Sequence, residues 1–448
     1  MPADNSRRAF LAAAATIAAA APAAATAQTQ RPVPPLPVNP SQRRGSAMTN
    51  GEFSTTRLAR MHDVMTRHVD GGRLPGLVTL VSRRGDTQVD TIGAMAFDDS
   101  TPMRRDTIFR IASMTKPLTA AAAMILVEDG RLRLDDPVDD ILPELKDRKV
   151  LRSLDSPLDD TVPAKRAITL RDLLTFRAGY GAIMVFPEKY PIQKAMADAG
   201  VAPSGRIFPG SADELMQKFG SLPLVHQPGE QWLYHSGSDI LGVLIARASG
   251  QTLERLLTER IFAPLGMKDT GFSVPAAKID RLPVAYNTDV KTKERVVFDA
   301  AKGGAFAKPP AFESGGGGLV STVDDYLAFA RMMLGQGRSG RERILSRASV
   351  ELMTTDHITP AQKAASAFAP NFWDNRGWGF GLSVITRRDD LAGTPGRFGW
   401  DGGYGTSAYM DPKEDLVGIL MTQRLWEAPV PPAVVTDFWT QVYQAIDD

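Results

Sequence analysis

Hydrophobic positions in this chain follow two periodicities, and their order along the sequence predicts the arrangement of the fold. Residues 58–69 carry apolar side chains at helical spacing, which predicts an amphipathic helix. Two alternating segments, 77–82 and 87–92, flank Arg84-Gly85-Asp86 and predict a β-hairpin. Strand patterns recur near the C-terminus, in 381–385, 406–410 and 416–421. A last helical pattern, with apolar positions between 434 and 443, follows them.

The region between these β-rich ends is mostly helical in pattern. We therefore predict an α+β fold, an α/β sandwich whose antiparallel sheet is built from both chain ends and flanked by helices, with a helical region inserted. The expected sheet lobe comprises 51–112 and 331–448, and the expected helical lobe comprises 113–330. Such a junction favours a ligand-binding cleft.

The first 50 residues predict export. Residues 1–27 carry Arg7-Arg8, an Ala-rich apolar run and a small-x-small site before Gln28, as in a twin-arginine signal peptide. The alternative is an uncleaved anchor, but Pro22 interrupts the run. Residues 28–50 are rich in Pro, Gln and Arg, which predicts a flexible tail. We expect a periplasmic or secreted bacterial protein with no integral membrane segment after cleavage.

Composition narrows the chemistry. Lys plus Arg total 52 against 51 for Asp plus Glu, so no bulk charge favours nucleic acid. There is no cysteine, and the five histidines lack metal-pair spacing. We therefore expect no cofactor, no metal and a small-molecule ester or amide substrate. The sequence does not predict the oligomeric state.

Ser113 and Lys116 are the first candidate site residues. They precede the apolar run 119–127, which predicts a buried helix with Pro117 in its first turn. Positions i and i+3 share a helix face, so the two side chains can meet, and burial would lower the pKa of the lysine. A Ser-x-x-Lys occurs about once by chance in such a chain, so its buried placement matters. The alternative is a capping serine with a surface lysine. No Gly-x-Ser-x-Gly nucleophile motif is present.

Two further segments could complete a site. Tyr234 precedes a helical pattern at 239–249, where a nearby lysine charge would lower the pKa of its phenol and let it shuttle a proton. The Gly-rich segment 398–406 begins a strand and permits close backbone approach to a ligand. Alone, the first could be a packing residue and the second a tight turn.

In order and spacing, these three elements resemble the serine β-lactamase and penicillin-binding-protein superfamily, most nearly class C β-lactamases and the carboxylesterases that share their fold. Segments 168–175, 264–272 and 316–322 also resemble sequence patterns of that family. The resemblance implies that Ser113 is the acylated nucleophile, Lys116 its general base and Tyr234 a proton relay. It further implies an oxyanion hole from the backbone N–H groups of Ser113 and Gly403.

The chain departs from the family pattern in its substrate-binding positions. Ser236 stands where β-lactamases have the asparagine of Tyr-x-Asn, and Trp400-Asp401-Gly402 replaces Lys-Thr-Gly. Trp400 would offer an apolar wall and Asp401 a negative charge, so we expect anionic β-lactams to bind poorly. The aromatic residues of 368–380 could line the site or pack in the core.

The resulting prediction is a serine hydrolase, foremost a carboxylesterase that acts through an acyl-enzyme. Amide or peptide hydrolysis, or weak β-lactamase activity, could use the same machinery. A non-catalytic penicillin-binding-like sensor module is the alternative from another class, and intact Ser113, Lys116 and Tyr234 argue against it.

Overall fold

A computed structural model describes residues 53–203 and 205–447 of the chain. The predicted signal peptide and tail, 1–27 and 28–50, lie outside the described residues. Within the described ranges, no helix is both long enough and apolar enough to cross a membrane.

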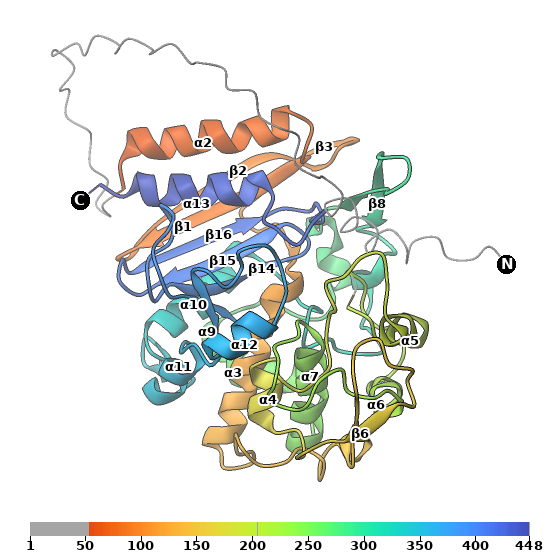
Figure 1. The fold of residues 1–448 in the computed structure, drawn as a ribbon. Coiled ribbons are helices and arrows are strands. Elements are labelled where there is room, and N and C mark those ends of the chain that lie inside the picture. Colours follow the sequence, from red (N-terminus) through yellow and green to blue (C-terminus); the bar gives the residue numbers. More distant parts are fainter. Residues whose placement is uncertain (1–52, 204, 448) are drawn as a thin grey trace, which may run out of the picture.

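One eight-stranded antiparallel sheet joins the two ends of the chain (Figure 1). Its strands, in spatial order, are β12 (Arg376–Trp378), β13 (Ser383–Ile385), β14 (Phe398–Gly402), β15 (Thr406–Asp411), β16 (Leu416–Met421), β1 (Gly76–Arg83), β2 (Asp86–Ala96) and β3 (Asp99–Pro102). The N-terminal and C-terminal strands meet where β1 pairs with β16, with Leu80 opposite Ile419. The predicted fold class is therefore confirmed.

The predicted hairpin forms between β1 and β2. Arg83 pairs with Asp86, which leaves Arg84 and Gly85 as a two-residue turn. Both turn residues have positive φ, 46° and 90°, as the twist of a two-residue hairpin requires. The glycine makes this conformation accessible.

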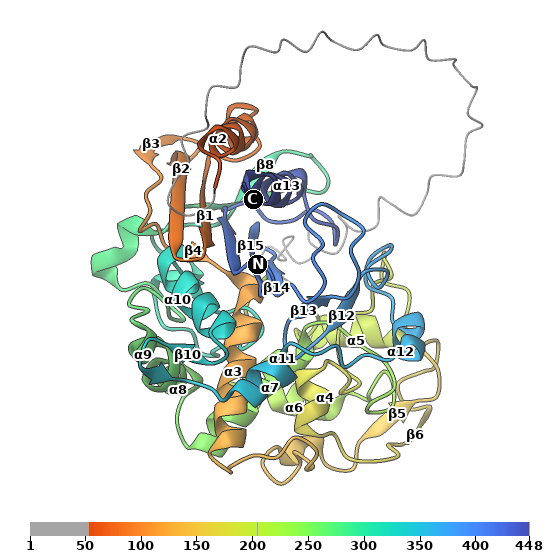
Figure 2. The same cartoon turned by 90° about the vertical axis from the view of Figure 1, so that its left-hand side faces the viewer.

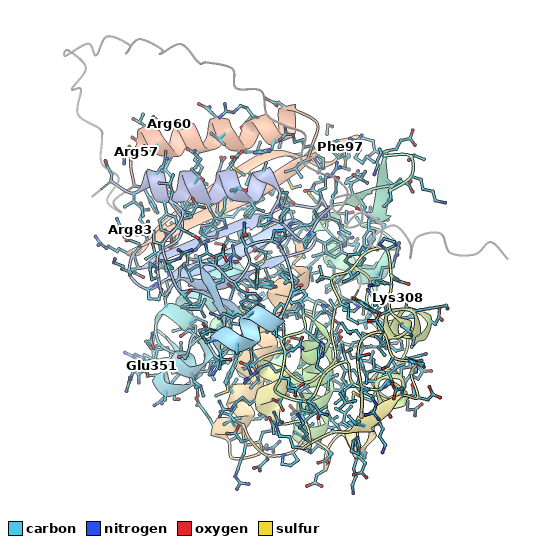
Figure 3. All side chains as sticks on the ribbon, in the orientation of Figure 1. Arg57, Arg60, Arg83, Phe97, Lys308 and Glu351 are labelled. Atoms are coloured by element: carbon cyan, nitrogen blue, oxygen red, sulfur yellow. The ribbon has the colours of Figure 1, made fainter. Side chains whose placement is uncertain are left out.

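Helices α2 (Thr55–Asp70) and α13 (Ala433–Ala445) cover one face of the sheet (Figure 1). Met61 and Met65 of α2 are buried against this face, whereas Arg57 and Arg60 lie on the outer side of the helix (Figure 3). The amphipathic pattern of 58–69 therefore positions this helix. Gly418 is required below α13, because a Cβ there would lie 2.6 Å from the ring of Trp439.

The opposite face of the sheet rests on α3 (Thr115–Glu128), which descends into the middle of the helical region (Figure 2). Residues 115–126 are all buried, so the apolar run that the sequence shows becomes the axis of the main core. Its start, beneath the sheet, is where the candidate nucleophile lies.

The remaining elements surround α3 and its loops. The helices are α4 (Leu170–Leu174), α5 (Pro191–Ala199), α6 (Ala212–Ser221), α7 (Ser236–Ser249), α8 (Leu253–Leu257), α9 (Ala263–Leu265), α10 (Val323–Leu334), α11 (Arg347–Met353) and α12 (Pro360–Ala365). Small strand pairs are β4 (Phe109–Arg110) with β9 (Val320–Ser321), β5 (Lys149–Leu151) with β6 (Thr161–Pro163), β7 (Ala285–Thr288) with β8 (Arg295–Asp299), and β10 (Arg338–Ser339) with β11 (Glu342–Arg343). Helix α10 spans position 331, where the sequence suggested a lobe boundary.

Candidate active site

Ser113 lies in a single 3-10 turn, Ala112–Met114, directly before α3. Ala112 has a φ of 43°, a conformation that L residues rarely adopt, at the point where the chain turns from β4 into the helix. Lys116, in the first turn of α3, places its Nζ 2.9 Å from Ser113 Oγ. The predicted Ser113–Lys116 pair therefore forms.

Lys116 is completely buried. Burial lowers the pKa of its ammonium group to about 7, although the charge of Asp239 opposes the shift. The amine also donates to the carbonyl oxygen of Gly316 at 2.5 Å and lies 3.2 Å from His235 Nδ1. At neutral pH a substantial fraction of the amine is thus uncharged and able to accept a proton.

Tyr234 reaches the same centre from the segment before α7. Its phenol hydrogen-bonds with Ser113, and its oxygen accepts the indole N–H of Trp400 at 2.6 Å. The expected lowering of its pKa is wrong: burial raises the pKa of the phenol well above its ordinary value. Lys116 Nζ lies over the face of the ring, 4.7 Å from its centroid, and not at the oxygen. Tyr234 is therefore a neutral phenol, a proton donor at rest.

The end of β14 lies against the nucleophile turn. A Cβ on Gly402 would lie 2.3 Å from the carbonyl oxygen of Ile111, so only glycine permits this approach. The next residue, Gly403, borders the same pocket as Ser113. This placement fits the oxyanion hole that the resemblance implies.

Asp401 points elsewhere. Adjacent residues of a strand face opposite sides of a sheet, so Trp400 faces the pocket and Asp401 faces α13. The Asp401 carboxylate accepts hydrogen bonds from Ser407 Oγ at 2.6 Å and from the Tyr409 hydroxyl at 3.0 Å. Burial raises its pKa. Asp401 is among the residues that line the pocket, but its carboxylate is engaged by Ser407 and Tyr409 on the other face of the sheet.

Ser236 does not line the pocket. It is buried, its hydroxyl has no hydrogen-bond partner within the described ranges, and it is not among the described residues that line the pocket. The side chain of this motif that lies within hydrogen-bond distance of Lys116 Nζ is instead His235. Sequence reasoning missed this residue, although it directly follows Tyr234.

Asp239 and Gly316 were missed as well. Asp239 lies one turn into α7 and contacts His235 Nε2 through its Oδ2 at 3.1 Å. Its Oδ1 accepts hydrogen bonds from Ser314 and from the backbone N–H of Gly316. The i, i+4 spacing of His235 and Asp239 was the available signal.

A pocket of about 530 Å³ opens over Ser113. Tyr234, Trp400, Phe368 and Phe372 form its aromatic side, and Trp378 packs behind them against Trp400 with ring centroids 4.7 Å apart. The aromatic residues of 368–380 therefore do both things that the sequence left open: some line the site and others pack in the core. The other walls come from separated segments: 182–186, 205–208 and 425–431. An apolar, partly enclosed site of this size suits a small organic substrate.

Comparisons with known proteins identify the family of the chain. A model of the family described as Beta-lactamase matches residues 61–433. Protein Rv1367c of Mycobacterium tuberculosis is 42% identical over 374 residues, which cover 81% of this chain and 89% of the relative. Esterase EstB of Burkholderia gladioli is 30% identical over 395 residues, covering 84% and 93%.

The fold also matches a solved structure. EstCE1, described as a hydrolase with promiscuous acyltransferase activity, superposes with a TM-score of 0.71 over 87% of this chain and 99% of its own, at 24% sequence identity. This likeness shows the fold, and the family match together with the esterase relative supports a serine hydrolase-type enzyme. The chain belongs to the Beta-lactamase family, within the superfamily of serine β-lactamases and penicillin-binding proteins.

Proposed function

We propose that the protein is a carboxylesterase that hydrolyses small, largely apolar esters through an acyl-enzyme on Ser113. The observation that carries the proposal is the hydroxyl of Ser113, 2.9 Å from a buried amine whose pKa lies near 7, beneath an apolar pocket. Relatives in the family include an esterase.

In the proposed reaction, Lys116 accepts the Ser113 proton as Oγ attacks the ester carbonyl carbon. Collapse of the tetrahedral intermediate breaks the bond to the alcohol oxygen, which takes the phenol proton of Tyr234. The proton that Lys116 took from Ser113 then restores the Tyr234 phenol, so that both groups regain their resting states. In deacylation, water attacks the acyl carbonyl carbon and gives a proton to the Tyr234–Lys116 pair. The same pair returns a proton to Ser113 Oγ as the carboxylic acid departs.

The preference for esters over β-lactams rests on Trp400. At this position the indole N–H is already bonded to Tyr234, and the ring forms part of the apolar wall. A lysine there would supply a cation for the β-lactam carboxylate, as the family resemblance implies. An apolar acyl or alcohol group gains more binding free energy from the aromatic surface of Phe368 and Phe372 than an anionic β-lactam does.

The test is labelling with a fluorophosphonate, followed by intact mass and peptide mapping, together with kcat/KM on short p-nitrophenyl esters and on nitrocefin. We expect one adduct on Ser113, none in Ser113→Ala, and an ester efficiency well above that for nitrocefin. Failure to label Ser113 would refute the catalytic assignment. Comparable turnover of nitrocefin would refute the ester preference.

We also propose that the chain is exported through its N-terminal segment, because Arg7-Arg8 and the site before Gln28 match a twin-arginine signal. Expression in a bacterium, cell fractionation and N-terminal sequencing test this. Mature protein outside the cytoplasm that begins at Gln28 is the expected result. Replacement of both arginines by lysine should retain it inside.

A further inference from the structure

His235 has no role in the reaction described above, yet it touches the general base. Its Nδ1 lies 3.2 Å from Lys116 Nζ, and its Nε2 lies 3.1 Å from Asp239 Oδ2. The imidazole and carboxylate are only 19% and 14% exposed. The three side chains therefore form a chain of contacts that ends at the atom that would take the Ser113 proton.

The backbone at His235 is in an unusual conformation. With φ 84° and ψ −63°, and a hydrogen bond from Ser236 N to Tyr234 O at 3.3 Å, the residue is the centre of a γ-turn of the rare positive-φ type. Such a conformation is strained for a residue with a side chain. The turn brings the imidazole, and not the hydroxyl of Ser236, to Lys116.

The contacts around Asp239 fix the protonation of this group. Its Oδ1 accepts from Ser314 Oγ at 2.6 Å and from Gly316 N at 2.9 Å. Burial raises the pKa of the carboxyl, but the interaction with His235 and these hydrogen bonds outweigh it and hold the pKa below its ordinary value. Asp239 is therefore an ionised carboxylate that only accepts hydrogen bonds.

His235 must then be a neutral imidazole of one particular tautomer. Burial, followed by the charge of Lys116, lowers its pKa. A neutral imidazole carries one N–H, and a carboxylate can only accept it, so the hydrogen resides on Nε2. Nδ1 is consequently an acceptor that faces the lysine.

This tautomer determines how a neutral Lys116 is oriented. The amine has two N–H groups and one lone pair, and three partners surround it: Gly316 O, His235 Nδ1 and Ser113 Oγ. The first two can only accept, so they take both N–H groups, and the lone pair remains for the Ser113 hydroxyl. We propose that His235 and Asp239 are positioning residues that aim the lone pair of Lys116 at Ser113.

Gly316 supports the arrangement from the facing loop. Its N–H binds Asp239 and its carbonyl binds Lys116, so one residue holds both ends of the chain of contacts. A Cβ at this position would lie 2.9 Å from Asp239 Oδ1 and 3.2 Å from His235 Cε1. Only glycine fits there without displacing the pair.

This inference rests on the proposed function, and Asp239→Asn tests it. The amide can donate to His235 Nε2, which moves the imidazole hydrogen to Nδ1 and directs it at the lysine lone pair. We expect the rate of fluorophosphonate labelling and kcat on p-nitrophenyl acetate to fall by about 100-fold or more, because the base then faces a donor. Lack of any labelling of wild-type Ser113 would instead refute the proposed function.

The pH dependence of kcat/KM in Asp239→Asn distinguishes a positioning role of Asp239 from a purely structural one. The titratable groups that face His235 are Lys116 from α3, Asp239 from α7 and the adjacent Tyr234; the facing loop contributes Ser314 and Gly316. The negative charge of Asp239 raises the pKa of Lys116. Asp239→Asn removes this charge and should therefore lower the lysine pKa. The acid limb of kcat/KM should then move to lower pH, and its plateau value should fall. An unchanged labelling rate and acid limb in Asp239→Asn would overturn the proposal.

A control variant, Asp437→Asn, and a pair of His235 variants test whether a loss of activity comes from positioning or from unfolding. Asp437→Asn removes the carboxylate from His68 Nε2, at 2.8 Å, on the α2–α13 side of the sheet, and should leave labelling unchanged. His235→Asn tolerates positive φ and can present Oδ1 in place of Nδ1, whereas His235→Leu offers no acceptor. Asn should therefore retain at least tenfold more activity than Leu. Equal activity of these two variants would overturn the proposal.

Discussion

The indole N–H of Trp400 donates a 2.6 Å hydrogen bond to the phenolic oxygen of Tyr234. One lone pair of that oxygen is thereby occupied, and the phenol proton is free to point toward Ser113 or a leaving group. The tryptophan is thus an apolar wall of the pocket and also a partner of the proposed proton relay.

Replacement of Trp400 by phenylalanine removes this donor and keeps most of the apolar surface. We expect kcat on p-nitrophenyl esters to fall about tenfold, which corresponds to about 1.4 kcal/mol, with a smaller change in KM. Trp378→Phe is the matched control, because its Nε1 has no hydrogen-bond partner among the described residues and it packs directly on Trp400. A similar fall in both variants would show that packing matters and not the hydrogen bond.

Activity should depend on the protonation of Lys116. The neutral amine is the active form and its pKa is about 7, so kcat/KM should fall about tenfold per pH unit below that value. Above it the rate should reach a plateau. Stopped-flow labelling of Ser113 between pH 5 and 9 measures this limb directly. A flat rate across pH 6–8 would contradict the role of Lys116 as base.

The same buried lysine should reduce stability. Its pKa falls from 10.5 to about 7 on folding, so the folded state binds fewer protons than the unfolded state between these values. The free energy of unfolding of the wild type should therefore rise with pH from 7 to 10.5.

Lys116→Met lacks this titration. We expect the inactive variant to be more stable than the wild type at pH 6, by an amount on the order of a few kcal/mol, with the gap narrowing as pH rises. Urea unfolding at several pH values measures the difference. A wild type that is the more stable protein at pH 6 would mean that the hydrogen bonds of Lys116 outweigh its burial cost.

Two adjacent glycines at the end of β14 should respond differently to alanine. A Cβ on Gly402 would meet Thr406 Oγ1 at 2.1 Å and Ile111 O at 2.3 Å, whereas nothing lies within 4 Å of a Cβ on Gly403. Gly402→Ala should lower Tm and reduce labelling of Ser113 by about 100-fold, because the strand must move from the nucleophile turn. Gly403→Ala should leave Tm unchanged. Equal Tm values for the two variants would contradict the close approach.

Several features of the fold follow from local sequence. The turn Arg84-Gly85 and the alternation around it specify the β1–β2 hairpin, and the apolar run after Ser113 specifies the buried α3. These depend on periodicity within a few residues. The pKa of Tyr234 could not be predicted in this way, because its direction depends on burial among rings such as Trp232 and Phe368 from distant segments.

Side-chain direction was the other unpredictable quantity. Asp401 adjoins Trp400 in sequence, yet the pleat of β14 places its carboxylate against Ser407 and Tyr409 on the opposite face of the sheet. His235 replaces Ser236 at the lysine because one positive φ redirects the chain. Neither the strand register nor this φ value is readable from residue types.

Local sequence was enough to predict that Ser113 and Lys116 can meet, because residues three apart in a helical turn share a face, and the structure places them 2.9 Å apart. The other contacts of the site join segments that are far apart in the chain. Trp400 meets Tyr234 across 166 positions, and Lys116 meets Gly316 across 200. Contacts of this kind depend on how the sheet packs on α3, and it is the same packing that removes water from Lys116 and lowers its pKa.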